Sequence, residues 1–212
     1  MTSAKLLERR LASGLEALGS PLDEQRRAAL LAYLEELHRW NRSYNLTAVR
    51  DPLDMVTRHL LDSLAVLPFI GDGPLLDAGT GAGLPGVPLA IAHPALEVTL
   101  LDSAGKKIRF LNHVKRTLRL VNAHPVQARV QDHVPEQPLA AVISRAFASL
   151  ADFAAAVRAM RGGAPRLLAM KGRLPRAELD ALPGDVRVEA VEKLRVPGLQ
   201  EDRHLVIMSL VT

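Results

Sequence analysis

Residues 75–86 read Leu-Leu-Asp-Ala-Gly-Thr-Gly-Ala-Gly-Leu-Pro-Gly. The apolar front is typical of a buried strand end, the glycines predict a tight turn, and the apolar run 87–92 predicts the helix that leaves it. Glycine suits this turn because a side chain would hold a ligand away from the backbone, and because so short a turn uses φ values that other residues avoid. The amino end of the helix then faces the ligand. We therefore expect Gly79, Gly81 and Gly83 to lie against a bound molecule.

A carboxylate comes directly after the next predicted strand. The run 97–101 reads Glu-Val-Thr-Leu-Leu and ends at Asp102, nineteen residues after Gly83. Nucleotide-binding sheets place the acid that holds ribose hydroxyls at this point. The pairing predicts a nucleoside-containing cofactor at the carboxyl ends of parallel strands, with a simple strand-end helix cap as the alternative role of Asp102.

The identity of the cofactor depends on charge. The spacing Gly81-x-Gly83-x-x-Gly86 matches the dinucleotide fingerprint, so a nicotinamide cofactor is open. An acidic residue just ahead of the first glycine, here Asp77 before Gly79, is instead typical of class I S-adenosylmethionine (SAM) methyltransferases. A sulfonium and an ammonium suit a nearby carboxylate, whereas a pyrophosphate is repelled by one. SAM is therefore favoured over NAD and over a turn without a ligand.

Composition limits the chemistry. A chain of 212 residues with 48% hydrophobic residues can form one α/β domain with an appendage. The chain has no cysteine, which excludes disulfides, thiolate metal sites and a cysteine nucleophile, and with it cytosine-C5 methylation by the usual covalent route. We expect no metal site.

Charge is placed unevenly along the chain. Residues 1–72 carry nine Lys and Arg against ten Asp and Glu, although the net charge of the whole chain is +4. The segment 104–120 holds six basic residues and no acid, which suits a polyanion. No apolar run approaches the roughly 18 residues of a membrane span, and residues 1–10 lack a signal-peptide core. We expect a soluble, cytoplasmic protein with no membrane partner.

Hydrophobic periodicity predicts a helical cap and then alternating strands and helices. Helices are expected from about Leu7 to Leu18, over 22–40 and over 52–70, with a polar and aromatic break at 40–47. Strands are expected at 74–78, 97–101, 124–128, 140–144 and 165–170, helices near 86–92, 104–120 and 148–160, and a closing hairpin at 186–191 and 205–211. The predicted organisation is a cap at 1–72 and an α/β domain at 73–212, with a Rossmann-like sheet of seven strands, mostly parallel, that ends in an antiparallel pair.

Several sequence blocks carry a family resemblance. They read WNRSYNLTAVRDP from residue 40, RHLLDSL from 58, LDAGTGAGLPGVPLA from 76, LLDSAGKKIRFL from 100, ISRAFASL from 143, MKG from 170 and RHLV from 203. The chain resembles the bacterial 16S ribosomal RNA guanine-N7 methyltransferases, the RsmG family, also called glucose-inhibited division protein B. The resemblance implies a class I methyltransferase that moves the SAM methyl group to N7 of one guanine in the 530 loop of 16S rRNA, position 527 in the usual rRNA numbering.

The chemistry of N7 fits the residues at the end of the fourth predicted strand. Methyltransferases of exocyclic base nitrogens carry an Asn/Asp-Pro-Pro-aromatic motif there, whereas residues 143–147 read Ile-Ser-Arg-Ala-Phe. Guanine N7 has a free lone pair and no proton to lose, so no general base and no catalytic side chain is expected. Catalysis then consists of holding N7 in line with the methyl group. A methyltransferase of small molecules could lack the motif too.

The resemblance and the motifs together give a set of cofactor residues. Asp77 either lies near the methionine ammonium or holds the turn through backbone N–H groups. Arg145 contacts either the cofactor, which the resemblance favours, or an rRNA phosphate, and residues 130–131 either contact adenine or simply begin a helix. The predicted cofactor residues are Asp77, Gly79, Gly81, Gly83, Leu84, Asp102, Val130, Gln131 and Arg145.

Basic side chains supply the predicted RNA contacts, which are to phosphates and give affinity rather than base choice. Lys171 either meets a phosphate or caps a loop, and His59 and Asp62 are either a packed pair on one helix face or part of a pocket roof. The RNA-binding candidates are Arg39, Arg42, Arg58, Lys106, Lys107, Arg109 and Lys171. We expect the protein to be a monomer and its partner to be 16S rRNA or the small ribosomal subunit. The alternatives are a SAM-dependent small-molecule methyltransferase, an NAD-dependent oxidoreductase and a non-catalytic, nucleotide-sensing RNA-binding module.

Overall fold

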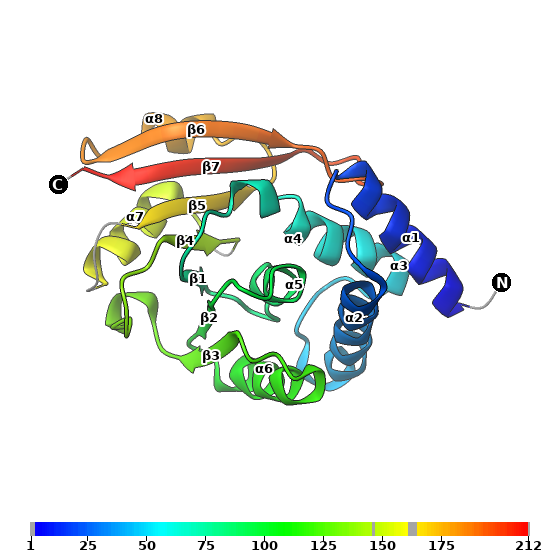
Figure 1. Cartoon of the computed structure of the whole chain (residues 1–212). Helices are drawn as coiled ribbons and strands as arrows, with labels where there is room; N and C mark the ends of the chain where they lie inside the picture. The colour runs from blue at the N-terminus through cyan, green and yellow to red at the C-terminus, as the bar shows by residue number, and fades with distance from the viewer. Residues whose placement is uncertain (1–2, 146, 161–164, 212) are drawn as a thin grey trace.

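The computed structural model describes residues 3–145, 147–160 and 165–211, and its centre is a seven-stranded sheet with the order β3-β2-β1-β4-β5-β7-β6 (Figure 1). The strands are β1 (Leu75–Ala78), β2 (Val98–Asp102), β3 (Ala123–Gln127), β4 (Ala141–Ser144), β5 (Arg166–Lys171), β6 (Val186–Leu194) and β7 (Arg203–Leu210). The longer helices are α1 (Ser3–Ala17), α2 (Glu24–Tyr44), α5 (Gly86–Ala92), α6 (Gly105–Leu118) and α7 (Leu150–Ala159). The shorter ones are α3 (Pro52–Met55), the π-helix η1 (Val56–Leu61), α4 (Asp62–Leu64), α8 (Arg176–Asp180) and the 3₁₀ turns η2 (Leu67–Phe69) and η3 (Val130–Asp132).

The first five strands are parallel, and the last two are antiparallel. β1 lies between β2 and β4, and all four of its residues are buried, because helices cover both faces of a parallel sheet. β7 pairs antiparallel with β5 on one side and with β6 on the other. The predicted fold class, including the closing hairpin, is confirmed.

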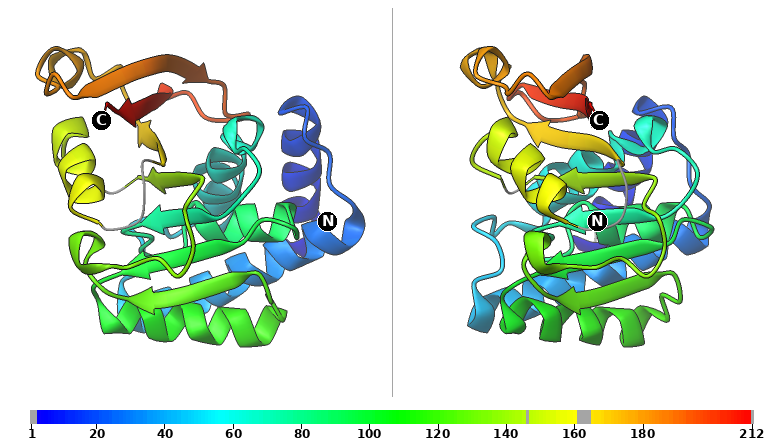
Figure 2. Two further views of the ribbon diagram at one scale, coloured as in Figure 1. Left: turned by 60° about the vertical axis from the view of Figure 1, so that its left-hand side comes forward. Right: turned by 90° about the vertical axis from the view of Figure 1, so that its left-hand side faces the viewer.

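Two hydrophobic clusters lie on the two faces of the sheet. Successive strand residues alternate between them, so that Leu75 packs into the larger cluster and Leu76 into the smaller one. The larger cluster contains side chains of α1, α2, α5 and α6, and the smaller one contains those of α7. Figure 2 shows this asymmetry, with the yellow α7 on one side of the sheet and the blue amino-terminal helices on the other.

The amino-terminal helices differ in detail from their predicted bounds. α2 begins after Asp23, whose side chain accepts from the Arg26 amide, and it continues to Tyr44 rather than ending near residue 40. Asn45 then ends the helix with a left-handed φ of 48°. The helix predicted over 52–70 is composed of α3, η1, α4 and η2, with the π-helix at its centre. In the described part of the chain no helix has the length and apolarity needed to cross a membrane.

Candidate functional site

The glycine loop after β1 is fixed by backbone conformation and by packing. Gly79, Gly81 and Gly83 have φ values of 69°, 62° and 94°, a region that side chains disfavour. A Cβ on Gly83 would lie 2.5 Å from a methyl carbon of Val87, so this glycine is also required by packing. A Cβ on Gly81 would meet only the Gly79 carbonyl oxygen, at 3.9 Å. The loop therefore leaves open space above Gly81, where a ligand can approach the backbone.

Asp77 stabilises the glycine loop through hydrogen bonds. Its Oδ2 accepts from the Thr80 hydroxyl at 2.6 Å and from the Gly86 amide at 2.8 Å. Its Oδ1 is buried and has no hydrogen-bond partner among the described residues. Burial raises the pKa of Asp77 to about 6, although the bonds from Thr80 and Gly86 and the charge of Arg145 oppose the rise. Asp77 thus stabilises the turn through Oδ2, while its Oδ1 has no hydrogen-bond partner among the described residues.

Asp102 lines a pocket of about 310 Å³ beside the loop. Its Oδ2 accepts from the Gly81 amide and from Lys107 Nζ, both at 3.0 Å, and its Oδ1 accepts from the Ala104 amide at 2.9 Å. The pocket brings together residues that are far apart in the sequence: Gly79, Asp102, Lys107, Val130, Gln131 and Phe147. The structure therefore places seven of the nine predicted cofactor residues around this cavity or in the glycine loop: Asp77, Gly79, Gly81, Gly83, Asp102, Val130 and Gln131.

Two of the predicted cofactor residues lie elsewhere. Leu84 is 4% exposed and packs in the larger hydrophobic cluster. Arg145 lines a second pocket, of about 370 Å³, on the other side of the ends of β1 and β4. Asp77 pairs with Ile143 across these strands, so that Gly79 and Arg145 each come two residues later. Ala146, next to Arg145, lies outside the described residues.

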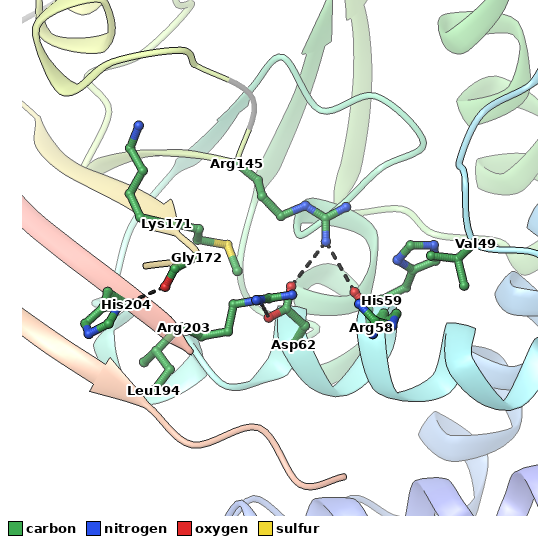
Figure 3. A pocket seen from close by; sticks show the side chains of 11 residues that line it. Val49, Arg58, His59, Asp62, Arg145, Lys171, Gly172, Leu194, Arg203 and His204 are labelled. Carbon is green, nitrogen blue, oxygen red and sulfur yellow. Dashed lines mark hydrogen bonds and ion pairs between the residues drawn. The ribbon is translucent and has the colours of Figure 1, made fainter. Parts of the chain in front are cut away.

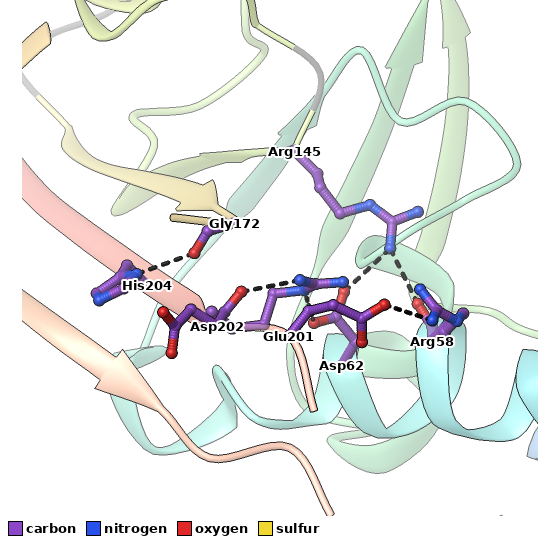
Figure 4. Close-up of polar contacts among 8 residues, drawn as sticks. Arg58, Asp62, Arg145, Gly172, Glu201, Asp202 and His204 are labelled. Carbon is purple, nitrogen blue, oxygen red and sulfur yellow. Dashed lines mark hydrogen bonds and ion pairs between the residues drawn. The ribbon is translucent and has the colours of Figure 1, made fainter. Parts of the chain in front are cut away.

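Asp62 is the centre of the second pocket (Figure 3). It is 2% exposed and accepts from Arg145 Nη1 at 3.3 Å and from Arg203 Nε at 2.9 Å. Arg145 Nη1 also lies 3.5 Å from the Arg58 carbonyl oxygen in the π-helix. Figure 4 shows how Arg58 in turn pairs with Glu201, just before β7. The Asp62 carboxylate thus connects the amino-terminal helices to Arg145, just after β4, and to Arg203, the first residue of β7.

His59 lies in the same pocket as a neutral imidazole. Its Nε2 is 2.9 Å from the Thr47 hydroxyl, and its Nδ1 is buried without a partner among the described residues. Burial and the nearby Arg145 and Arg58 lower the pKa of His59 to about 4. Both His59 and Asp62 line the pocket, and their hydrogen bonds are to other residues of the described chain.

Two features of the site were not predicted. Tyr33 on α2 is fully buried and donates to the Ala82 carbonyl oxygen at 2.7 Å, which ties the cap to the glycine loop. Arg203 and His204 enter the second pocket because β7 pairs with β5, in the register Lys171 to His204. The block RHLV was a visible signal for them, but only the sheet order shows which cavity they reach.

The predicted RNA-binding residues lie in several parts of the structure. Lys107 points to Asp102, and Arg58 lines the second pocket. Lys171 is 13% exposed, pairs with Glu178 at 2.8 Å and lies near the Phe147 and Ala148 carbonyls, so it holds a loop. The others lie along α2 and α6: Arg39, Arg42, Lys106 and Arg109.

Comparisons with known proteins agree on one family. A family model described as GidB, rRNA small subunit methyltransferase G, matches residues 26–206. The protein named ribosomal RNA small subunit methyltransferase G in Pseudomonas aeruginosa (strain LESB58) is 54% identical over 199 residues, which cover 93% of both chains. Its namesake in Salmonella schwarzengrund (strain CVM19633) is 50% identical over 190 residues, 90% of this chain and 92% of the relative.

Solved structures support the fold. The pyocyanin biosynthetic protein PhzM has a TM-score of 0.60 at 16% identity and covers 85% of this chain and 61% of its own. Coclaurine N-methyltransferase, solved with N-methylheliamine and S-adenosylhomocysteine, has a TM-score of 0.52 at 15% identity. The match covers 90% of this chain and 73% of the coclaurine N-methyltransferase chain. At such identities the likeness concerns the fold alone.

Proposed function

The chain belongs to the GidB family of rRNA small subunit methyltransferases G, and from this premise we propose that it transfers the methyl group of SAM to N7 of a guanine in 16S rRNA. Family membership makes it a SAM-dependent enzyme that acts on the RNA of the small ribosomal subunit. The atom and the nucleotide, N7 of the guanine at position 527 in the 530 loop, are the proposal.

The residues around the glycine loop fit SAM. Open space above Gly81 admits a ligand against the backbone, and Asp102 faces the adjoining pocket where a ribose would lie. The Asp77 carboxylate is fully buried against the loop, and its negative charge suits a cationic ammonium or sulfonium bound there. The Asp77 carboxylate, which binds the loop amide of Gly86, would repel the pyrophosphate of NAD, and this counts against the oxidoreductase alternative. When bound, SAM supplies an electrophilic methyl group on a sulfonium.

The second pocket has the chemistry of a guanine acceptor site. Arg145 and Arg203 offer donors for the O6 carbonyl oxygen of guanine, and the buried Asp62 carboxylate, which accepts from both arginines, fixes their orientation. The pocket lies across the ends of β1 and β4 from the Asp102 pocket, so that a methyl group held over the glycine loop faces it. This opposed pair of pockets is the observation that carries the proposal.

Methylation at N7 leaves a positive charge on the guanine ring. Among the described residues, the second pocket is lined by four cations, which suit the phosphates beside the target base, and by the Asp62 carboxylate, which opposes the charge of the methylated ring. His59 is neutral at pH 7 because its pKa is lowered to about 4, so it adds no positive charge beside that ring. N7 has no proton to lose, and accordingly the role of these side chains is to orient the base and exclude water.

The test is to locate the methyl group. Purified protein is incubated with SAM and protein-free or subunit-bound 16S rRNA, and the product is mapped by mass spectrometry and by primer extension after borohydride reduction and aniline cleavage. We expect one 7-methylguanine in the 530 loop, which rRNA from cells that lack the protein does not contain. A methyl group on an exocyclic nitrogen, or none on RNA, would refute the proposal and favour the small-molecule or non-catalytic alternatives.

We further propose that the protein acts as a monomer in the cytoplasm. The edge strand β6 displays the charged side chains of Arg187, Glu189 and Lys193 on exposed positions, which disfavours pairing with another sheet. The division into a cap at 1–72 and a methyltransferase domain at 73–212 is proposed as a division of labour. Residues 1–72 contribute Tyr33 to the loop and His59 and Asp62 to the acceptor pocket.

A further inference from the structure

A stripe of basic side chains runs along α6, away from both pockets. Lys106, Arg109, His113 and Arg116 are spaced by three, four and three residues, which places them on one helix face. α6 begins just after the carboxyl end of β2 and leads to the amino end of β3, so its far end lies at the opposite edge of the sheet. Its 14 residues span about 20 Å. The stripe therefore reaches a surface that the cofactor and the target base do not use.

A groove lies at this far end, between α6 and α2, which Figure 1 shows side by side. We call it the α6 groove and define it by Trp40, Arg109, Lys115, Arg116, Arg119 and Val121. Among the described residues, none of its four cations has a carboxylate oxygen within 4.0 Å, and its three arginines are exposed. On the neighbouring surface of α2, Glu36 is already paired with Arg39 and His113. The groove therefore carries uncompensated positive charge.

The groove also has an apolar wall. Trp40 is packed against Tyr44, Phe110 and His113, with ring centroids 4.9, 5.6 and 5.0 Å away. Val121 is 82% exposed, the highest value among the large hydrophobic residues of the described chain that are exposed. Single-stranded RNA is bound where cations meet phosphates and a flat apolar or aromatic surface meets a base. Both components are present here.

Compensation of the helix dipole explains only part of this cluster. Lys115 and Arg116 lie in the last turn of α6, where cations favour the helix terminus. Arg109 lies mid-helix, out of reach of that effect. Arg119 ends the helix with a φ of 53°, a conformation that glycine or asparagine adopts at lower cost.

We propose that the α6 groove binds a segment of 16S rRNA that lies outside the loop carrying the target guanine. Phosphates contact Arg109, Lys115, Arg116 and Arg119, and an unpaired base lies against Trp40 and Val121. The choice of 16S rRNA rests on the proposed function; the presence of an anionic, single-stranded ligand rests on the groove itself. The α6 groove shares no lining residue with either of the two pockets, so recognition has two separate contacts.

The experiment compares two RNAs and two charge-matched variants. The test variant is Lys115→Gln/Arg116→Gln/Arg119→Asn, in which asparagine suits the left-handed position. The control variant, Lys5→Gln/Arg9→Gln/Arg187→Gln, removes three exposed cations elsewhere. Binding of protein-free 16S rRNA and of a short hairpin with only the target loop is measured between 50 and 300 mM salt. Urea midpoints confirm that both variants fold.

We expect the Kd of the test variant for 16S rRNA to rise about tenfold or more at 100 mM salt, with the log Kobs against log salt slope smaller by about 2. Its Kd for the hairpin and the behaviour of the control variant stay within twofold of the wild type. Equal losses on both RNAs, or no loss on protein-free 16S rRNA, would overturn the proposal. A loss only when ribosomal proteins are present would overturn it too, because the partner would be a protein. Failure of the wild type to methylate N7 would refute the proposed function and leave this binding result unaffected.

Discussion

Replacing Lys107 by methionine should strengthen SAM binding, because of how the oxygens of Asp102 are shared. A carboxylate offers about four lone-pair sites. In the structure three are used, by the Gly81 amide, the Ala104 amide and the Lys107 ammonium. A ribose with two hydroxyls needs two sites, so that one present donor must withdraw. The two amides are fixed in the backbone, whereas the lysine side chain is 33% exposed and flexible.

The size of the effect depends on the exposure of this ion pair. Partly exposed pairs contribute up to about 1 kcal/mol, so that removing the competing ammonium should lower the Kd of SAM about two- to fivefold. Removal of a positive charge near a cationic ligand acts in the same direction. Isothermal titration calorimetry of SAM, at 50 and 500 mM salt, measures the change, and high salt should reduce the difference between variant and wild type.

The matched comparison is Asp102→Asn, which keeps the shape of the side chain and removes its charge. Loss of a charged hydrogen-bond partner should weaken SAM binding by about 1 to 3 kcal/mol. If Lys107→Met instead raised the Kd fivefold or more, Lys107 would contact the cofactor directly. The inference that Lys107 competes with the ribose hydroxyls for Asp102 would then be wrong.

Other predictions concern stability. Tyr33→Phe leaves a buried loop carbonyl without its donor and should lower the free energy of unfolding by about 1 to 2 kcal/mol in urea melts; an unchanged midpoint would show that this bond does not hold the loop. Gly86→Ala places a Cβ 2.3 Å from a leucine methyl carbon and should destabilise by about 1 to 3 kcal/mol, whereas Gly71→Ala, which meets nothing within 4 Å, serves as its control. The raised pKa of Asp77 makes stability fall as pH rises from about 4 to 6, and the lowered pKa of His59 makes it rise between about 4 and 6.5. As pH rises across this range, the free energy of unfolding of Asp77→Asn should therefore increase by up to about 3 kcal/mol relative to the wild type, and that of His59→Gln should decrease by a similar amount. Urea melts in steps of half a pH unit measure both changes. Variant profiles that run parallel to the wild-type profile would contradict both assignments.

Local chemistry explains the features that could be predicted from the sequence. The glycine loop, the strand that ends at Asp102 and the final hairpin all depend on residues close together in the chain. Alternation of side chains along a strand and glycine conformation act over such short distances. Predicted strand bounds consequently differ from the observed ones by only a few residues.

Long-range pairing explains the features that were missed. Asp62 meets Arg203 across 141 residues of sequence and Arg145 across 83 residues. Neither contact can be deduced from a pattern along the chain, since both depend on the sheet order. The π-helix η1 also escaped prediction, because a single-residue widening of a helix leaves its apolar spacing nearly unchanged.

The position of β7 in the sheet affects how the protein assembles. Because β7 lies between β5 and β6, β6 has no strand to pair with until β7 is in place. Until then both neighbours present open edges, which are sites for pairing with other chains. Insertion of β7 closes these edges and at the same step delivers Arg203 to Asp62. Completion of the sheet and completion of the acceptor pocket are therefore the same folding event, and a chain that misfolds here loses solubility and substrate binding together.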